Sequence, residues 1–120
     1  MSYKIAVGSS DGNIIDEHFG TTFQFLIYEI NGKEYKLIKT IESEYSNDCA
    51  KHHINNFSEI INKIGDCRAV LVDKIGPSAS KALKIKNIDS FSIYEYVETA
   101  LSKLVAYYYK IDGSKKNDRD

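Results

Sequence analysis

Short apolar segments alternate with polar turns along most of the chain. Five of them have the length of strands and are rich in Val, Ile and aromatic residues: 3–9, 23–30, 34–42, 68–75 and 88–93. An Asn-Gly pair separates the second segment from the third, which predicts a β-hairpin. The run 68–75 is almost continuously apolar, which predicts a strand that is covered on both faces of the sheet.

Three further segments carry apolar residues at the spacing of a helix. The first covers 49–64, the second begins at Gly76-Pro77 and reaches about residue 86, and the third covers about 94–109. The last residues, 112–120, include no apolar residue, which predicts a disordered tail. We therefore expect one domain over residues 1–111.

The order of these segments predicts the class of fold. A strand, a hairpin and then alternating helices and strands imply an α/β domain with a mixed five-stranded sheet and helices on its faces. Right-handed crossovers would place the first strand beside the fourth. The loops 8–20 and 74–80 would then lie side by side, at the edge of the sheet where ligands of such folds bind. We expect a site near residues 16–20, Asp-Glu-His-Phe-Gly.

Composition and charge narrow the classes of partner. The chain has 120 residues, 42% of them hydrophobic, and a formal net charge of -1, so neither nucleic acid nor an anionic membrane is an expected partner. No apolar run reaches the roughly 20 residues of a membrane span, and residues 1–10 lack the features of a signal peptide. We expect a cytoplasmic protein whose two cysteines are reduced.

His18 is the best-placed candidate for a ligand. Iron in sulfur-rich clusters takes thiolate and imidazole ligands, and a single imidazole on a loop could hold a cluster and still release it. The alternative is a loop histidine that caps a helix or pairs with Asp16 or Glu17. Taken from the residues alone, that alternative is the more common situation for a single histidine.

Cys49, His52 and His53 form a second candidate group. Their spacing would put thiol and imidazole on one face of the first turn of a helix, where the pKa of a thiol is lowered. His53 borders the apolar face, whereas His52 lies on the polar side. An ordinary helix start with solvated histidines is an equally good interpretation.

The segment Gly76–Ser80 is a candidate anion site. Its backbone amides and the hydroxyl groups of Ser78 and Ser80 would lie at the start of a helix, beside the loop of His18. The alternative is a Gly-Pro turn with no ligand. Cys67, at the start of a predicted strand, is expected to be a buried apolar residue rather than a ligand.

The chain contains nine tyrosines, three of them at 107–109. Tyrosines that stack on bases accompany basic grooves, and the near-neutral charge argues against such a groove. We expect these side chains at sheet edges or between two copies of the chain, so a homodimer is one option.

Several motifs together resemble those of the dinitrogenase iron-molybdenum cofactor biosynthesis family, which includes proteins of the NifX type and the carboxyl-terminal domain of NifB. They are "IAVGSSDGNIIDEHFG", "FLIYEI", "DCRAVLVDKIGPSASKAL" and "NIDSF". The resemblance extends to about residue 109. Members of the NifB carboxyl-terminal type are similar in having a cysteine near position 49, but often in a glycine-rich setting that "NDCAKHH" lacks.

The resemblance implies a ribonuclease H-like fold and a protein without catalytic activity. Such a protein would carry an iron-sulfur or iron-molybdenum cofactor precursor transiently, as cargo, between the proteins that donate and accept it. His18 matches the family's ligand-contacting histidine. His18 and, from its spacing to the histidines, Cys49 are the expected metal ligands. His52, His53, Gly76 and Ser78 complete the expected cofactor site.

Two other functions are compatible with parts of the sequence. A regulatory or protein-interaction module could sense small anions at Gly76–Ser80 without using any thiol or imidazole. A metal-dependent nuclease or phosphotransferase would need converging carboxylates. The segment 3–9 carries no acidic residue, and the nearby acids belong to loops or strand ends, so this second alternative is disfavoured.

Overall fold

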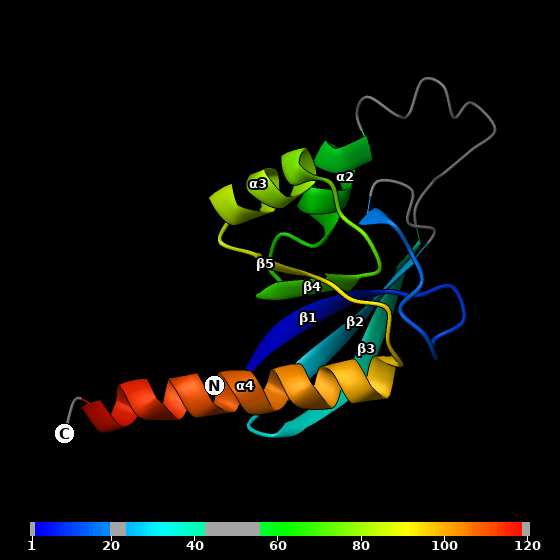
Figure 1. Cartoon of the computed structure of the whole chain (residues 1–120). Helices are drawn as coiled ribbons and strands as arrows, with labels where there is room; N and C mark the ends of the chain where they lie inside the picture. Colours follow the sequence, from blue (N-terminus) through cyan, green and yellow to red (C-terminus); the bar gives the residue numbers. More distant parts are fainter. Residues whose placement is uncertain (1, 20–23, 43–55, 119–120) are drawn as a thin grey trace.

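The computed structural model describes residues 2–19, 24–42 and 56–118 (Figure 1). Within these ranges five strands form a single mixed sheet in the order β3-β2-β1-β4-β5. The strands are β1 (Ser2–Gly8), β2 (Gln24–Asn31), β3 (Glu34–Glu42), β4 (Ala69–Val72) and β5 (Asp89–Ser92). The helices are α2 (Asn56–Lys63), α3 (Pro77–Ile85) and α4 (Val97–Asp118). The expected α/β domain with a mixed five-stranded sheet is confirmed.

The antiparallel half of the sheet is the predicted hairpin. Strands β2 and β3 pair from Asn31 and Glu34 outward, and the register shifts between Ile27 and Tyr28. Gly32, in the turn, has a φ of 67°, a backbone conformation that glycine adopts without steric cost. Strand β1 pairs with β2 in antiparallel fashion along its whole length.

The parallel half of the sheet brings distant segments together. Strand β1 pairs with β4, with Ile5, Ala6 and Val7 opposite 69–71, and β4 pairs in parallel with β5. The predicted neighbourhood of the first and fourth strands is therefore confirmed. All four residues of β4 are buried, as expected for a strand covered on both faces, and β4 lies between β1 and β5 in the sheet.

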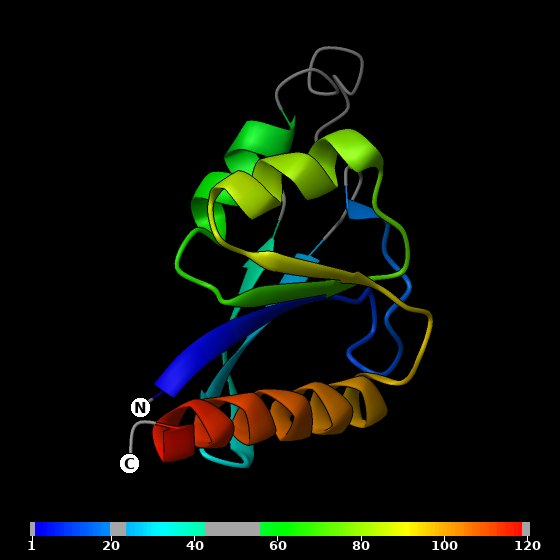
Figure 2. The same cartoon turned by 60° about the vertical axis from the view of Figure 1, so that its left-hand side comes forward.

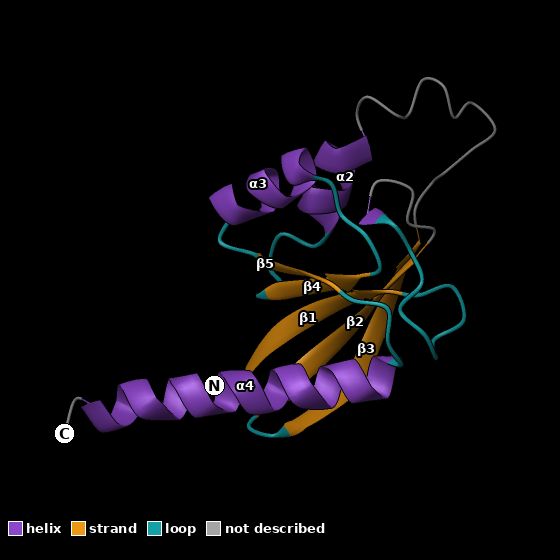
Figure 3. Cartoon of the chain, viewed as in Figure 1, coloured by secondary structure: helices purple, strands orange, loops and turns teal. Residues whose placement is uncertain are grey.

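Helices cover both faces of the sheet. Helices α2 and α3 lie on one face and α4 lies on the other, as Figures 1, 2 and 3 show. The core under α2 and α3 includes Phe25, Ile27 and Leu83, whereas the core under α4 includes Ile5, Val7 and Leu101. The alternation of residues along β1 and β2 between these two cores follows from the two-residue period of a strand.

Two helices have boundaries that differ from the expected ones. Helix α2 was expected over 49–64; residues 43–55 lie outside the described residues, and the described helix begins at Asn56. Helix α4 starts at Val97 and continues to Asp118, through most of the segment expected to form a disordered tail. A contact with the sheet accounts for part of this extension, because Asp112 forms an ion pair with Arg68.

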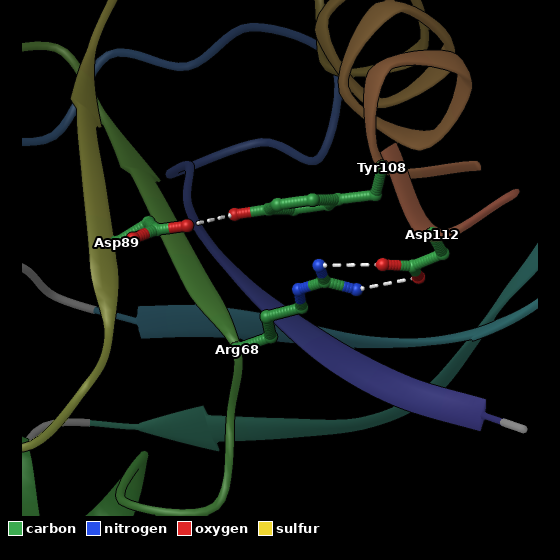
Figure 4. A network of polar contacts seen from close by, with 4 residues as sticks. All are labelled: Arg68, Asp89, Tyr108 and Asp112. Carbon is green, nitrogen blue, oxygen red and sulfur yellow. Dashed lines mark hydrogen bonds and ion pairs between the residues drawn. The ribbon is translucent and has the colours of Figure 1, made fainter. Parts of the chain in front are cut away.

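Arg68 joins this end of α4 to the sheet (Figure 4). Its guanidinium donates two hydrogen bonds to the Asp112 carboxylate, at 2.9 and 3.0 Å, and lies 3.8 Å from the centroid of the Tyr108 ring. The Tyr108 hydroxyl donates to Asp89 Oδ2 at 2.5 Å. Burial and this hydrogen bond raise the pKa of Tyr108 far above its usual range. The cluster therefore fixes α4 against β4 and β5.

Helix α4 is also the longest helix of the chain's described part, with 22 residues. No helix among the described residues is both long enough and apolar enough to cross a membrane.

Cys67 is a core residue, as expected. Its side chain is 5% exposed and packs in the core under α2 and α3. Burial raises the pKa of the thiol to about 12. Cys67 precedes β4, so it lies at the opposite end of that strand from the predicted site.

We predict that replacing Tyr108 by Phe lowers the free energy of unfolding by about 1 kcal/mol, because the hydrogen bond to Asp89 is lost and the ring is kept. Urea unfolding followed by circular dichroism measures the change. The control is Tyr107→Phe, since Tyr107 is 53% exposed and its change should stay within about 0.5 kcal/mol. Equal effects of the two substitutions would refute the assigned role of Tyr108.

We also predict that Cys67 resists thiol reagents in the folded protein. The folded-state pKa of about 12 lies above the usual value near 8.5, so the thiol stays protonated in the folded protein at neutral pH. The contribution of the protonated thiol to the stability of the fold therefore declines only as the pH rises above about 8.5. With Cys49→Ser to leave one thiol, modification at pH 8 should be about a thousandfold slower in native buffer than in denaturant. Comparable rates in the two solutions would contradict this burial.

Candidate functional site

The loop after β1 begins with a compact turn. Ser9, whose side chain is fully buried, accepts a hydrogen bond from the Gly12 amide at its Oγ, at 2.9 Å. Asp11 Oδ1 accepts from the amides of Asn13, at 2.8 Å, and Ile14, at 3.2 Å. These amides lower the pKa of the Asp11 carboxyl group. Asp11 is thus a turn-forming residue, as expected for Asp in such positions.

The middle of the loop is held by two further side chains. Asp16 accepts hydrogen bonds from the Ser10 amide at 3.0 Å and from Ser10 Oγ at 2.7 Å. The side-chain amide of Gln24 donates to the carbonyl oxygens of Ser9, at 2.9 Å, and Ser10, at 3.3 Å. The first half of the loop is therefore closed on itself and tied to the start of β2.

The second half of the loop lies beside the end of β4. The amide of Asp73 donates to the Glu17 carbonyl, and the amide of Phe19 donates to the Lys74 carbonyl, both at 2.9 Å. His18 and Lys74 form an isolated parallel bridge. The predicted contact between the loops 8–20 and 74–80 is thus confirmed over the described residues. Residues 17–19 occupy the place beside β4 that β1 would occupy if it continued.

Gly8 makes this close approach feasible. A Cβ atom at position 8 would lie 3.0 Å from Val72 Cγ1 and 3.3 Å from the Glu17 Cβ. Any larger side chain would push the loop away from the end of β4.

Burial differs from residue to residue along the segment 15–19, which carries His18. Ile15 and Phe19 are buried, whereas Asp16 and His18 are exposed. Phe19 packs against Phe25, with ring centroids 6.0 Å apart, under α2 and α3. Ile15 packs in the core under α4. The two apolar side chains anchor the segment on opposite faces of the sheet, and the histidine remains at the surface.

The start of α3 follows Lys74 by two residues. Gly76 is its N-cap, no side chain caps the helix, and the first turn carries no acidic residue. Ser78 is exposed, whereas the Ser80 hydroxyl lies 3.3 Å from the Ser90 hydroxyl, within hydrogen-bond distance. Of the two serines in the predicted anion site, Ser80 therefore faces β5. Phe19 pairs with Lys74, two residues before the N-cap of α3, so the loop of residues 18–19 lies close to the start of that helix along the chain.

The expected second group of ligands cannot be placed. Cys49, His52 and His53 lie outside the described residues. Among the residues that the structure describes, no group of three or more His, Cys, Asp or Glu side chains could hold a metal ion. The described part of the site thus consists of His18, Lys74 and the start of α3.

Sequence reasoning did not identify Lys74, Gly8 or Gln24. Lys74 is exposed and its backbone forms the bridge to His18, so its positive charge belongs to the same edge of the sheet as the imidazole. The one sequence feature that indicates a role for Lys74 is its place in the loop 74–80, which is predicted to lie beside the loop 8–20. Gly8 and Gln24 act through contacts distant in sequence, for which the local pattern gives no signal.

Comparison with known proteins identifies the family. The family model "Dinitrogenase iron-molybdenum cofactor" matches residues 1–107. The FeMo cofactor biosynthesis protein NifB of Chlorobaculum tepidum is 33% identical over 97 residues, which cover 81% of this chain and 22% of that protein. Protein NifX of Klebsiella pneumoniae is 24% identical, with 98% of this chain and 74% of that protein covered.

The match to the NifB proteins is partial. The chain spans about a fifth of the length of NifB from Frankia alni and from Chlorobaculum tepidum.

Solved structures share the fold. The crystal structure of PH0822 matches with a TM-score of 0.66 at 18% identity, covering 86% of this chain and 89% of that one. A structure from Methanocaldococcus jannaschii matches with a TM-score of 0.58 at 19% identity, covering 88% and 90%. At these identities the likeness concerns the fold alone. The family model, which matches nearly the whole chain, decides the assignment: this chain belongs to the dinitrogenase iron-molybdenum cofactor family.

Proposed function

We propose that this protein is a non-catalytic carrier, which binds an iron-sulfur or iron-molybdenum cofactor precursor transiently as cargo. The observation that carries the proposal is the placement of His18. It is exposed on a segment that is fixed by hydrogen bonds to Asp73 and Lys74 and by the burial of Phe19. An imidazole held in this way can contact a bulky ligand without a change in the fold.

The chemistry of the edge suits an anionic cluster. Imidazole nitrogen is a natural ligand of iron, and Lys74, whose backbone forms a bridge to His18, supplies a positive charge at the same edge. The start of α3 offers backbone amides without a competing acidic side chain in its first turn. A cargo held by few ligands can be released, whereas a full thiolate cage would retain it. Gly76 and Ser78 are therefore proposed as secondary contacts.

The family also supports a role in cofactor assembly. Its relatives include proteins named FeMo cofactor biosynthesis protein NifB and Protein NifX. We propose that the partners are the proteins that donate the cluster and accept it. The strand order, with β2 antiparallel to its neighbour β1, is compatible with the ribonuclease H-like topology that the sequence motifs imply.

A second candidate function is the sensing of a small anion at the start of α3. The uncapped helix start and the exposed Ser78 favour it, but the pairing of Ser80 with Ser90 removes one of the expected hydroxyl groups. Anion sensing would not require His18, so a single substitution separates the two functions.

We predict that His18→Ala weakens cluster binding by about tenfold or more, because the loop loses its only described imidazole. Anaerobic titration with an isolated iron-sulfur cofactor precursor, followed by gel filtration and analysis of iron and sulfide, measures the binding. Ser2→Ala is the control, since Ser2 is exposed at the opposite end of β1 and should leave the affinity unchanged.

Parallel substitutions test the other expected ligands. Cys49→Ser, His52→Ala and His53→Ala each report on one residue of the second group. If His18→Ala binds the cluster as tightly as the parent protein, the carrier site proposed here is wrong. Unchanged binding of phosphate or citrate by His18→Ala, together with no cluster binding by the parent, would support the anion-sensing module.

A further inference from the structure

A hollow on the α4 face of the sheet has no role in the proposed carrier function. It has a volume of about 620 Å³, within the range of roughly 300–1,000 Å³ that is typical of small-molecule sites. We call it the tyrosine pocket, because Tyr28, Tyr35 and Tyr96 line it. Among the described residues that line it, none belongs to 16–19 or 74–78.

Two of the rings, Tyr28 and Tyr35, pack edge to face against each other. The centroids of Tyr28 and Tyr35 are 6.0 Å apart, and their planes are inclined by 71°. Both rings pack against the core under α4. The Tyr35 hydroxyl lies 3.3 Å from Ser102 Oγ, within hydrogen-bond distance, which links this pair of rings to α4. The π-faces of these rings are therefore held in place before any ligand binds.

The third ring, that of Tyr96, is largely exposed to solvent. Tyr96 is 60% exposed, yet its backbone is fixed by an isolated bridge to Ile14, and Val97 donates a hydrogen bond to the Asn13 carbonyl at 2.8 Å. An aromatic ring at a fixed backbone position and with this degree of exposure is available to cover a bound ligand.

The charges around the pocket are negative. Asp11 and Glu98 both line it, and among the described lining residues there is no Lys or Arg. The amides of Asn13 and Ile14 lower the pKa of Asp11, so its carboxylate stays ionised at neutral pH. The pKa of Tyr28 is raised by burial, by Tyr35 and by Glu98, which is consistent with a Glu98 carboxylate close to the phenol ring.

We propose that the tyrosine pocket binds an organic cation, such as a quaternary ammonium or a guanidinium group. Aromatic faces attract a cation through their quadrupole, and carboxylates add a direct charge attraction. An anion would be repelled by Asp11 and Glu98. A divalent metal would need several converging oxygen ligands, and the described residues hold no such group.

The test uses choline and its uncharged isostere 3,3-dimethylbutan-1-ol as probes. A titration of the ¹⁵N-labelled protein, followed by NMR chemical shifts, should show saturable changes for choline at residues 11–14 and 96–99. We expect choline to bind at least about fivefold more tightly than the isostere. Equal affinities, or changes scattered over the surface, would overturn the proposal.

Two pairs of substitutions locate the site. Tyr96→Ala should weaken choline binding by about threefold to fivefold, whereas Tyr94→Ala, which alters a similarly exposed ring outside the pocket, should not. Glu98→Gln should also weaken choline binding by about threefold to fivefold. Its control is Glu29→Gln, because β2 places Tyr28 on the α4 face and the adjacent Glu29 on the other. Equal losses within either pair would overturn the proposal.

A further probe identifies the source of the cation. N-acetylarginine methylamide represents a basic side chain of a partner protein. If it binds more tightly than choline, the pocket receives such a side chain; if choline binds more tightly, the ligand is a free quaternary ammonium compound. Failure of both probes to bind would overturn the proposal.

Discussion

The parallel pairing of β1 with β4 is the contact on which the rest of the structure depends. It places the carboxyl ends of both strands at one edge of the sheet, so the loop after β1 meets the segment after β4. Gly8 and Val72 approach so closely there that a larger residue at position 8 would separate them. Because this pairing joins segments more than 60 residues apart, it also fixes the positions of α3 and α4 relative to the loop.

The loop after β1 contributes residues to both the candidate site at His18 and the tyrosine pocket. Ile15 enters the core under α4 and Phe19 enters the core under α2 and α3, so the segment between them crosses the edge of the sheet. Residues 11–14 line the tyrosine pocket, and His18 lies beside Lys74. A cargo at His18 and a cation in the pocket would thus contact different parts of the same ordered loop.

Local patterns were sufficient to predict the hairpin, the buried strand β4, the start of α3 and the neighbourhood of the two loops. They were insufficient for the end of α4, because Asp112 is held by Arg68, 44 residues away. The tail has no apolar residue, so its sequence alone favours disorder. The apolar side chains of Ile15 and Phe19 are buried and the polar His18 is exposed, as their residue types favour. Lys74, Gly8 and Gln24 act through tertiary contacts that no short motif encodes.

The proposed carrier function depends on direct contact between the imidazole of His18 and the bound cluster. Pulsed electron paramagnetic resonance on protein labelled with ¹⁵N-histidine and loaded with a paramagnetic cluster tests it directly. We expect a ¹⁵N hyperfine coupling that disappears in His18→Ala and persists in His52→Ala and His53→Ala. A coupling that survives in His18→Ala, or its absence from the loaded parent protein, would show that His18 does not contact the cluster.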